Sequence, residues 1–268
     1  MVSISAVIIT KNEESMIEDA IRSVSFCDEI IIIDNGSTDR TVPIARKHKA
    51  QVYEYASDDF SKSRNMGLRK AKGDWVLYID ADERVTKELM VHIKTVIANP
   101  QAKAAYRIKR KNYYFLRFEW PTVEKLERFF KRVKLRLWYG RLHESVVVDG
   151  EIGELDGFLV HYTHRSLSDM VNKTLMWSRT EAQLRLAANH PKVVWWRFPR
   201  VMLSAFYDSY VKQRGWKIGT PGLVESMYQA FSAFVTYAQL WEMQQERKTQ
   251  SFDFAQDKHA KLKTTNKS

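Results

Sequence analysis

The first hundred residues alternate between short apolar runs and segments whose apolar residues recur every three or four positions. The apolar runs are rich in β-branched residues, and they predict buried strands at 2–10, 29–33, 51–55 and 75–79. The periodic segments predict helices at 12–24, 41–48, 61–71 and 86–98. The hydroxyl of Ser37 or Thr38 is expected to cap the second of these helices. This alternation is typical of a doubly wound α/β sheet.

Polar side chains stand where three of these strands end. Thr10 ends the first strand, Asp34 the second, and the fourth stops abruptly at Asp80-Ala81-Asp82-Glu83. Because open α/β sheets bind ligands outside the carboxyl ends of their strands, we expect the three polar ends to share one site. Two aspartates at this spacing can hold a hard divalent metal, and the metal can hold a diphosphate.

The pattern changes after residue 104. Further strands are predicted at 104–109, 134–138 and 158–162, followed by helices at 168–188, 193–213 and 223–246. We therefore expect a catalytic α/β domain over 1–165, a helical subdomain over 166–247, and a tail over 248–268 without regular structure.

Composition narrows the class of protein. The 268 residues carry a formal net charge of +11 and 12% aromatic residues, which suggests anionic partners. A single cysteine, Cys27, excludes an intrachain disulfide. No basic leader precedes the first strand and no run reaches the roughly 18 apolar residues of a membrane span, so we expect a cytoplasmic protein.

Four motifs in order resemble the family 2 glycosyltransferases, which have the GT-A fold. They lie at residues 7–14 (VIITKNEE), 33–39 (IDNGSTD), 63–67 with 73–74 (SRNMG and GD), and 80–83 (DADE). Farther on, Gly140-Arg141-Leu142-His143-Glu144, His161-Tyr162 and the C-terminal helices are similar to the subgroup with the lipopolysaccharide inner-core glucosyltransferases of Gram-negative bacteria.

The resemblance implies a nucleotide pocket at the ends of the first two strands. Thr10, Asn12 and Glu13 would line it, and Asp34 would accept hydrogen bonds from the base or ribose. Many relatives have a second aspartate where this chain has Asn35, which keeps an acceptor and loses a charge.

The resemblance also implies a diphosphate and metal site. Arg64 would lie near the diphosphate, which a guanidinium fork suits, and Asp80 would bind ribose or a metal-bound water. Asp82 would ligate Mg²⁺ or Mn²⁺, with His161 completing the metal shell or touching the diphosphate.

An inverting transfer needs a base that takes the proton of the acceptor hydroxyl. Glu144 matches the family's base position, and Asp149 is the fallback. Ordinary structural roles compete: Asp80 and Asp82 as helix caps, Arg64 as an exposed charge, Glu144 as a surface partner of Arg141, and His161 as a strand-end residue.

Two segments outside these motifs carry clusters of aromatic and basic residues. Residues 193–200 (VVWWRFPR) suit peripheral contact with an anionic membrane, or equally the packing of the helical subdomain. Residues 109–117 suit a phosphorylated sugar acceptor, or equally a solvated loop.

The leading interpretation is an inverting glycosyltransferase that moves a hexose, with glucose favoured, from a UDP-sugar to a lipopolysaccharide core sugar. A peptide, a capsule precursor or another glycan is the alternative acceptor. Outside enzymes, the alternatives are a basic nucleic-acid-binding protein and an inactive GT-A scaffold. Dispersed basic residues and the lack of a recognisable nucleic-acid-binding motif argue against the former, so no nucleic-acid partner is expected.

Overall fold

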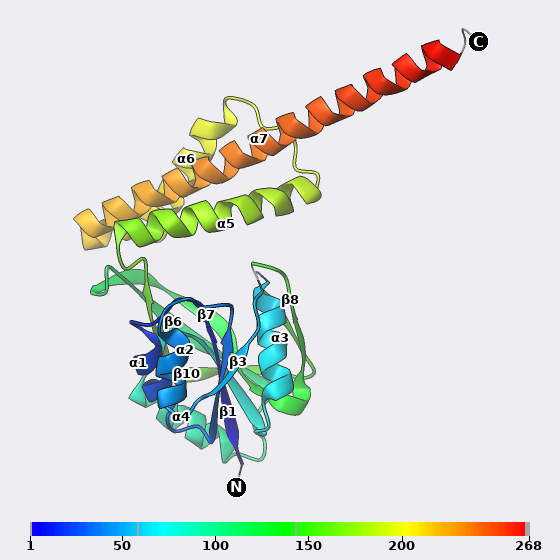
Figure 1. Cartoon of the computed structure of the whole chain (residues 1–268). Coiled ribbons are helices and arrows are strands. Elements are labelled where there is room, and N and C mark those ends of the chain that lie inside the picture. Colours follow the sequence, from blue (N-terminus) through cyan, green and yellow to red (C-terminus); the bar gives the residue numbers. More distant parts are fainter. Residues whose placement is uncertain (1, 58, 143, 266–268) are drawn as a thin grey trace. The chain divides into compact units, whose positions relative to one another are not determined.

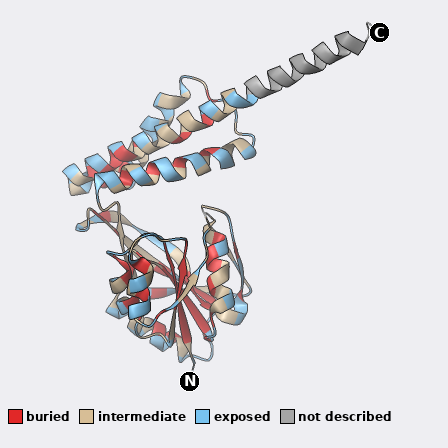
Figure 2. Ribbon diagram, in the orientation of Figure 1, coloured by how far each residue is buried: buried red, intermediate tan, exposed pale blue. Residues whose placement is uncertain are grey.

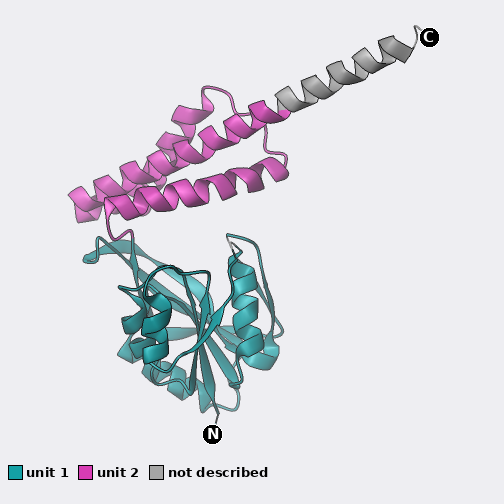
Figure 3. Cartoon of the chain, viewed as in Figure 1, with its two compact units in different colours: residues 1–163 teal, residues 164–268 magenta. Residues whose placement is uncertain are grey.

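The chain forms two compact units, residues 1–163 and 164–268 (Figure 3). A computed structural model describes residues 2–57, 59–142 and 144–265, with side chains described up to residue 247. Unit 1 contains all strands, and unit 2 is helical. Each unit is described below by itself.

An eight-stranded mixed sheet forms the centre of unit 1 (Figure 1). The strand order is β3-β2-β1-β4-β7-β6-β10-β5, and the first four are mutually parallel. The strands are β1 (Ile4–Thr10), β2 (Glu29–Asp34), β3 (Gln51–Glu54), β4 (Trp75–Asp80), β5 (Glu83–Val85), β6 (Ala105–Tyr114), β7 (Phe118–Lys131) and β10 (Ile152–Thr163). A separate hairpin pairs β8 (Leu135–Tyr139) with β9 (Ser145–Val148). The predicted α/β sheet is thus present.

Helices cover both faces of this sheet. The sheet therefore separates two apolar clusters, one on each face. The helices of unit 1 are α1 (Ile17–Ser23), α2 (Thr41–Lys47), α3 (Phe60–Lys70) and α4 (Lys87–Ile97). Side chains alternate between the two faces of β4, so Trp75, Leu77 and Ile79 join one cluster, while Val76 and Tyr78 join the other. Figure 2 shows the buried residues concentrated along these central strands.

The first helix is shorter than its sequence pattern predicts. We expected it to begin at Asn12, whereas α1 begins at Ile17. Asn12 has a φ of 54°, a left-handed conformation that a helix cannot contain. The intervening turn is closed by the carbonyl of Glu13, which accepts from the N–H groups of Met16 and Ile17.

The predicted cap of the second helix is also wrong. α2 begins at Thr41, after Arg40, which makes no side-chain capping hydrogen bond. Ser37 Oγ instead accepts from the N–H of Asn12, 2.8 Å away. The hydroxyl therefore joins the loops after β1 and β2 rather than capping a helix.

The region after residue 104 contains longer strands than the sequence pattern indicates. The basic and aromatic stretch is mostly β6 and β7, an antiparallel pair, and β7 also pairs antiparallel with β4. Because β7 lies beside the central strand, its aromatic residues enter the core: Phe129 stacks on Trp75 with ring centroids 4.6 Å apart. The solvated-loop interpretation of residues 109–117 is wrong for 109–114, which are strand.

Unit 2 consists of three helices and two short turns. They are α5 (Leu167–Ala187), α6 (Arg197–Tyr207), a π-helical turn at Asp208–Lys212, a 3₁₀ turn at Gly215–Ile218 and α7 (Thr220–Thr265). A small core joins Ala182 of α5, Val193 and Leu240 of α7. α7 runs into the segment predicted to be an unstructured tail, but the side chains from residue 248 on lie outside the described ones, so that expectation remains a prediction. Over the described chain, none of the helices combines the length and apolarity needed to cross a bilayer.

Gly67 in α3 gives a test of how tightly the helix packs on the sheet. A Cβ at this position would lie 2.3 Å from Cγ1 of Val7, a fully buried residue of β1. We expect Gly67→Ala to lower the free energy of unfolding by about 1–3 kcal/mol, because overpacking outweighs the gain in helix propensity. Urea unfolding followed by circular dichroism measures this.

Lys62→Ala, at an exposed position of the same helix, is the matched control for Gly67→Ala and should shift stability little. A Gly67→Ala protein as stable as the wild type would show that α3 does not approach β1 this closely.

Candidate active site

A buried arginine joins three segments of unit 1. Arg64 lies in α3 and its side chain is 2% exposed. Its Nε donates to Glu144 Oε1 at 2.6 Å, and its Nη2 donates to Asp80 Oδ1 at 3.1 Å. The structure therefore brings together three of the residues predicted to act in the site, and the exposed-charge interpretation of Arg64 is wrong.

Arg128 was not among the predicted residues, yet it holds the same aspartate. It lies in β7, is buried, and donates from Nη2 to Asp80 Oδ2 at 3.2 Å. Asp80 is thus held by one arginine at each carboxylate oxygen. The only signal in the sequence was an arginine directly before the apolar pair Phe129-Phe130, a pattern that does not reveal the strand partner.

A second ion pair lies beside this one. Glu83 is fully buried, accepts from Arg110 Nη1 at 2.8 Å and accepts from the backbone N–H of Asp80 at 3.0 Å. This hydrogen bond closes the turn between β4 and β5. Asp80 and Asp82 do not cap α4, because Thr86 does so by accepting from the N–H of Leu89.

These pairings decide the charge states at the sheet edge. Burial favours a raised pKa for Asp80, but Arg64 and Arg128 outweigh it and hold this pKa below its usual value. Burial likewise opposes the charged form of Arg64, while Asp80 and Glu144 raise its pKa. Burial and the neighbouring Arg64 lower the pKa of Arg128. Both arginines stay protonated because the intrinsic pKa of a guanidinium is so high.

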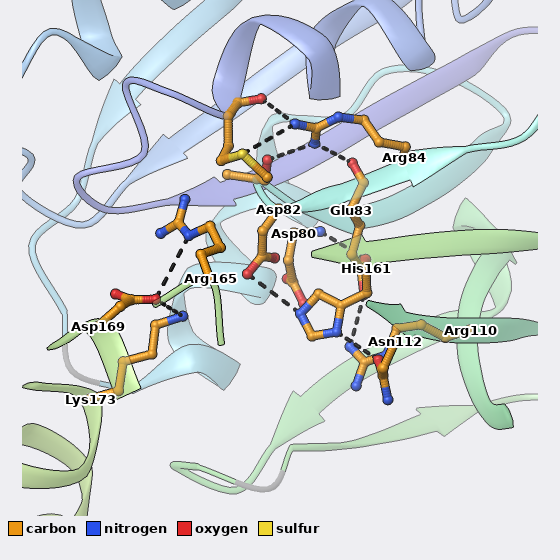
Figure 4. Close-up of polar contacts among 12 residues, drawn as sticks. Asp80, Asp82, Glu83, Arg84, Arg110, Asn112, His161, Arg165, Asp169 and Lys173 are labelled. Carbon is orange, nitrogen blue, oxygen red and sulfur yellow. Dashed lines mark hydrogen bonds and ion pairs between the residues drawn. The ribbon is translucent and has the colours of Figure 1, made fainter. Parts of the chain in front are cut away.

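Asp82 faces His161 at the edge of the sheet (Figure 4). The distance from His161 Nε2 to Asp82 Oδ2 is 3.4 Å, and the N–H of Tyr162 donates to the carbonyl of Asp82 at 3.0 Å. On the other side of the ring, Nδ1 lies 2.8 Å from Asn112 Oδ1. The structure therefore brings the two predicted metal ligands together.

The donor set at this pair suits a divalent cation. Asn112 contacts the ring at Nδ1, so the other ring nitrogen, Nε2, is directed at Asp82. An imidazole nitrogen and a carboxylate oxygen that face each other could both bind a cation between them. Among the described residues no cluster of three His, Cys, Asp or Glu side chains could hold a metal. A metal here would take its other ligands from phosphate and water, as Mg²⁺ commonly does.

The loops after β1 and β2 interlock through the residues predicted to line a nucleotide pocket. Asn12 Oδ1 accepts from the N–H of Thr38 at 2.8 Å, and the N–H of Glu13 donates to Thr41 Oγ1 at 2.8 Å. The side-chain oxygen of Asn12 and the backbone N–H of Glu13 thus hold the two loops together, although a ligand could have bound to the same groups.

Asp34 and Asn35 are committed to the protein in the same way. Asp34 is 1% exposed, and its carboxylate accepts from the N–H groups of Gly36 and Ser37. Asn35 Oδ1 accepts from Ser63 Oγ at 2.8 Å, tying this loop to α3. The structure places both residues at the predicted edge, but it shows them supporting the loop. Thr10 differs, because its buried hydroxyl has no hydrogen-bond partner among the described residues.

Asp149, the fallback base, lies away from this cluster. Its carboxylate pairs with Arg136 after the β8–β9 hairpin, and both side chains are more than half exposed. Arg64, rather than a surface residue, holds Glu144, whose side chain is 14% exposed. His143, which precedes Glu144, lies outside the described residues.

Comparison with known proteins identifies a family. The model described as "Glycosyl transferase family 2" matches residues 5–147. An uncharacterized glycosyltransferase of Rickettsia typhi is 32% identical over 91% of this chain and 88% of its own length. The lipopolysaccharide core biosynthesis glycosyltransferase LpsC of Rhizobium meliloti is 26% identical over 89% of this chain and 92% of its own.

Solved structures with some similarity include two glycosyltransferases. TarS residues 1–349 of S. aureus, in complex with UDP, has a TM-score of 0.44 at 16% identity and covers 91% of each chain. Glucosyl-3-phosphoglycerate synthase of Mycobacterium tuberculosis, with Mn²⁺, UDP-glucose and phosphoglyceric acid, has a TM-score of 0.35 at 25% identity over 42% of this chain and 44% of its own. The family resemblance and the GT-A fold expected from the motifs are confirmed.

The two arginines at Asp80 predict a distinct dependence of stability on pH. Since the pKa of Asp80 is lowered in the folded state, its stabilisation is present above the unfolded pKa of about 3.9 and is lost as pH falls through the folded pKa. Asp80→Asn should therefore be less stable than the wild type at pH 7, and the gap should shrink as pH approaches about 3.

Urea midpoints measured between pH 7 and pH 3 test this, with Asp149→Asn as control. Asp149 also pairs with an arginine, but on the surface, where an ion pair contributes little. A gap for Asp80→Asn that stays constant or widens on acidification would contradict the assignment.

Proposed function

The chain belongs to glycosyl transferase family 2, and from this membership we propose an inverting transfer of a hexose from a UDP-sugar to a lipopolysaccharide core sugar. The protein is a glycosyltransferase enzyme. Beyond this membership, the proposal specifies a UDP-sugar donor with glucose as the hexose, a lipopolysaccharide core acceptor, and a role for each site residue.

One observation carries the assignment of the site. Arg64 connects Asp80, at the carboxyl end of β4, with Glu144, which lies 80 positions after Arg64 in the sequence. A donor-binding acid and a base must lie close together, because the acceptor attacks the carbon that the diphosphate leaves. The strand end supplies the donor side and Glu144 supplies the acceptor side.

Asp82 and His161 would hold the metal. A divalent cation at this pair neutralises the charge of the departing nucleoside diphosphate. The imidazole nitrogen favours Mn²⁺ over Mg²⁺, which prefers oxygen ligands. Asn112 keeps the His161 ring in the required orientation, and Arg64 and Arg128 keep Asp80 ionised for ribose or a metal-bound water.

Glu144 would act as the general base. The acceptor hydroxyl oxygen forms a bond to the anomeric carbon, the bond to the diphosphate oxygen breaks, and the proton passes to the Glu144 carboxylate. In the structure this carboxylate is bound to Arg64. A diphosphate would compete for the same guanidinium, so donor binding would free Glu144 for the acceptor.

The similarity to LpsC supports a lipopolysaccharide core acceptor. Such an acceptor is attached to a lipid, which fits a protein at the inner face of the cytoplasmic membrane that makes peripheral contact with it. A peptide or another glycan is the alternative acceptor and is included in the test.

The function predicts specific losses in two variants. With UDP-glucose and a deacylated heptose-containing core oligosaccharide, Glu144→Gln should lower kcat by about 10²–10⁴-fold while UDP binding, measured by calorimetry, persists. Asp82→Ala should abolish the stimulation by Mn²⁺, since it removes the carboxylate ligand.

Asp149→Asn is the matched control, because it neutralises the other candidate base, which directly follows the same β8–β9 hairpin. It should leave kcat unchanged. Loss of activity in Asp149→Asn with a normal Glu144→Gln would reverse the assignment of the base. If UDP-glucose, UDP-galactose and UDP-N-acetylglucosamine all fail to bind or react, the UDP-sugar assignment is wrong.

A further inference from the structure

Unit 2 exposes an apolar surface along and beside α6. We define the α6 face as the exposed side chains of six residues: Trp195, Trp196, Leu203, Tyr207, Val211 and Trp216. Trp195 is 80% exposed, Leu203 69% and Trp216 53%. No residue of α6 is buried, as Figure 2 shows. A helix that only packed within unit 2 would bury its large apolar residues.

The other side of the same segment is anchored within unit 2. Phe198 packs against Phe234 of α7 with ring centroids 5.7 Å apart. Val193 is buried, and its N–H donates to Gln244 Oε1 at 2.9 Å. These contacts fix the orientation of α6 within unit 2. The exposure of the α6 face therefore follows from the packing of the opposite side of the segment.

Cations accompany the exposed rings of this face. The guanidinium carbons of Arg197 and Arg200 lie 5.1 and 5.8 Å from the Trp196 ring centroid. Two further pairs repeat the arrangement, Lys212 over Tyr207 and Lys217 over Trp216, each at 5.7 Å. Aromatic rings with adjacent cations are suited to the boundary between hydrocarbon and phosphate headgroups.

The whole segment has a net positive charge. Residues 190–219 contain six Lys and Arg residues and a single acidic residue, Asp208. Asp208 is itself paired with Lys212 at 2.6 Å. The α6 face therefore combines exposed apolar side chains with a surplus of positive charge, which complements a lipid surface that is apolar inside and anionic outside.

We propose that the α6 face binds the surface of an anionic lipid bilayer. Trp195, Leu203 and Trp216 would enter the headgroup region, and Arg200 and Lys217 would contact lipid phosphates. The helix would lie in the plane of the bilayer, in keeping with the lack of a spanning helix in the described chain. The purpose of this contact rests on the proposed function, because a lipid-linked acceptor lies at such a surface.

Binding of the full-length protein to vesicles tests the proposal. Cosedimentation with 7:3 phosphatidylcholine–phosphatidylglycerol vesicles should show binding that weakens with salt, and pure phosphatidylcholine should bind far less. Leu203→Glu should weaken partitioning by about tenfold, since it replaces an exposed apolar side chain of the α6 face with a charge. Arg200→Glu should weaken it by about thirty-fold, because it removes one positive charge and adds a negative one, each at about 1 kcal/mol.

Unit 1 offers matched controls. Val133 is 70% exposed, almost the same as Leu203, and Lys134 beside it is exposed. Val133→Glu and Lys134→Glu should bind vesicles like the wild type. No binding of the wild type to anionic vesicles, or equal losses in the control variants, would overturn the proposal. Absent vesicle binding together with self-association in sedimentation velocity would instead identify a protein interface.

The activity assay separates this result from the proposed function. Leu203→Glu should transfer sugar to the deacylated, water-soluble acceptor at the wild-type rate, because this acceptor needs no bilayer and Leu203 is not one of the site residues. If the wild type transfers no sugar but binds vesicles in a Leu203-dependent way, the enzymatic proposal fails and the membrane surface stands.

Discussion

The buried guanidinium of Arg64 is the constraint on which the site depends. Taking an arginine out of water is expensive unless its donors are satisfied by opposite charges. Asp80 and Glu144 satisfy two of its nitrogens, and Nη1 has no hydrogen-bond partner among the described residues. Strand end, helix and loop must therefore keep their relative positions, because moving any one leaves a buried charge unpaired.

The mixed sheet supplies the second half of this arrangement. A purely parallel sheet would bring only strand ends to the site, whereas antiparallel β7 beside β4 delivers a side chain from within a strand. Arg128 reaches Asp80 in this way, 48 positions away in the sequence. Asp80 is consequently held by the packing of the core as well as by loops, so the protein itself orients this carboxylate.

Local sequence patterns predicted the parallel half of the sheet well, because buried strands and amphipathic helices have clear periods. The strand ends at Thr10, Asp34 and Asp80 followed from the same patterns. The predictions that were wrong, the start of α1 and the cap of α2, depended on a single backbone dihedral or on a partner distant in the sequence. The φ of Asn12 shortens α1, and Ser37 finds the N–H of Asn12 instead of a helix end. Neither event leaves a periodic signal.

The site residues likewise divide into those that could be predicted and those that depend on contacts distant in the sequence. The motifs placed Asp82 and His161 correctly relative to each other, although 79 positions separate them, because the family resemblance carried the long-range information. The physical patterns alone would not have paired them. Arg128 and Asn112 lie in the irregularly charged strands β7 and β6, where register decides which side chains face inward, and register cannot be read from composition. The site thus depends on contacts between strands, whereas the sequence patterns predict each strand separately.

Charge is distributed differently between the two parts of the chain. At the sheet edge, Arg64, Arg110 and Arg128 pair with four carboxylates, so these arginines leave no surplus of positive charge there. The carboxylates are Asp80, Glu83, Glu124 and Glu144. A diphosphate would be poorly attracted there without a metal at Asp82 and His161. The positive surplus that gives the chain its net charge of +11 is strong in residues 190–219 instead. The basic composition is therefore better explained by the segment that carries the α6 face than by the residues at the sheet edge.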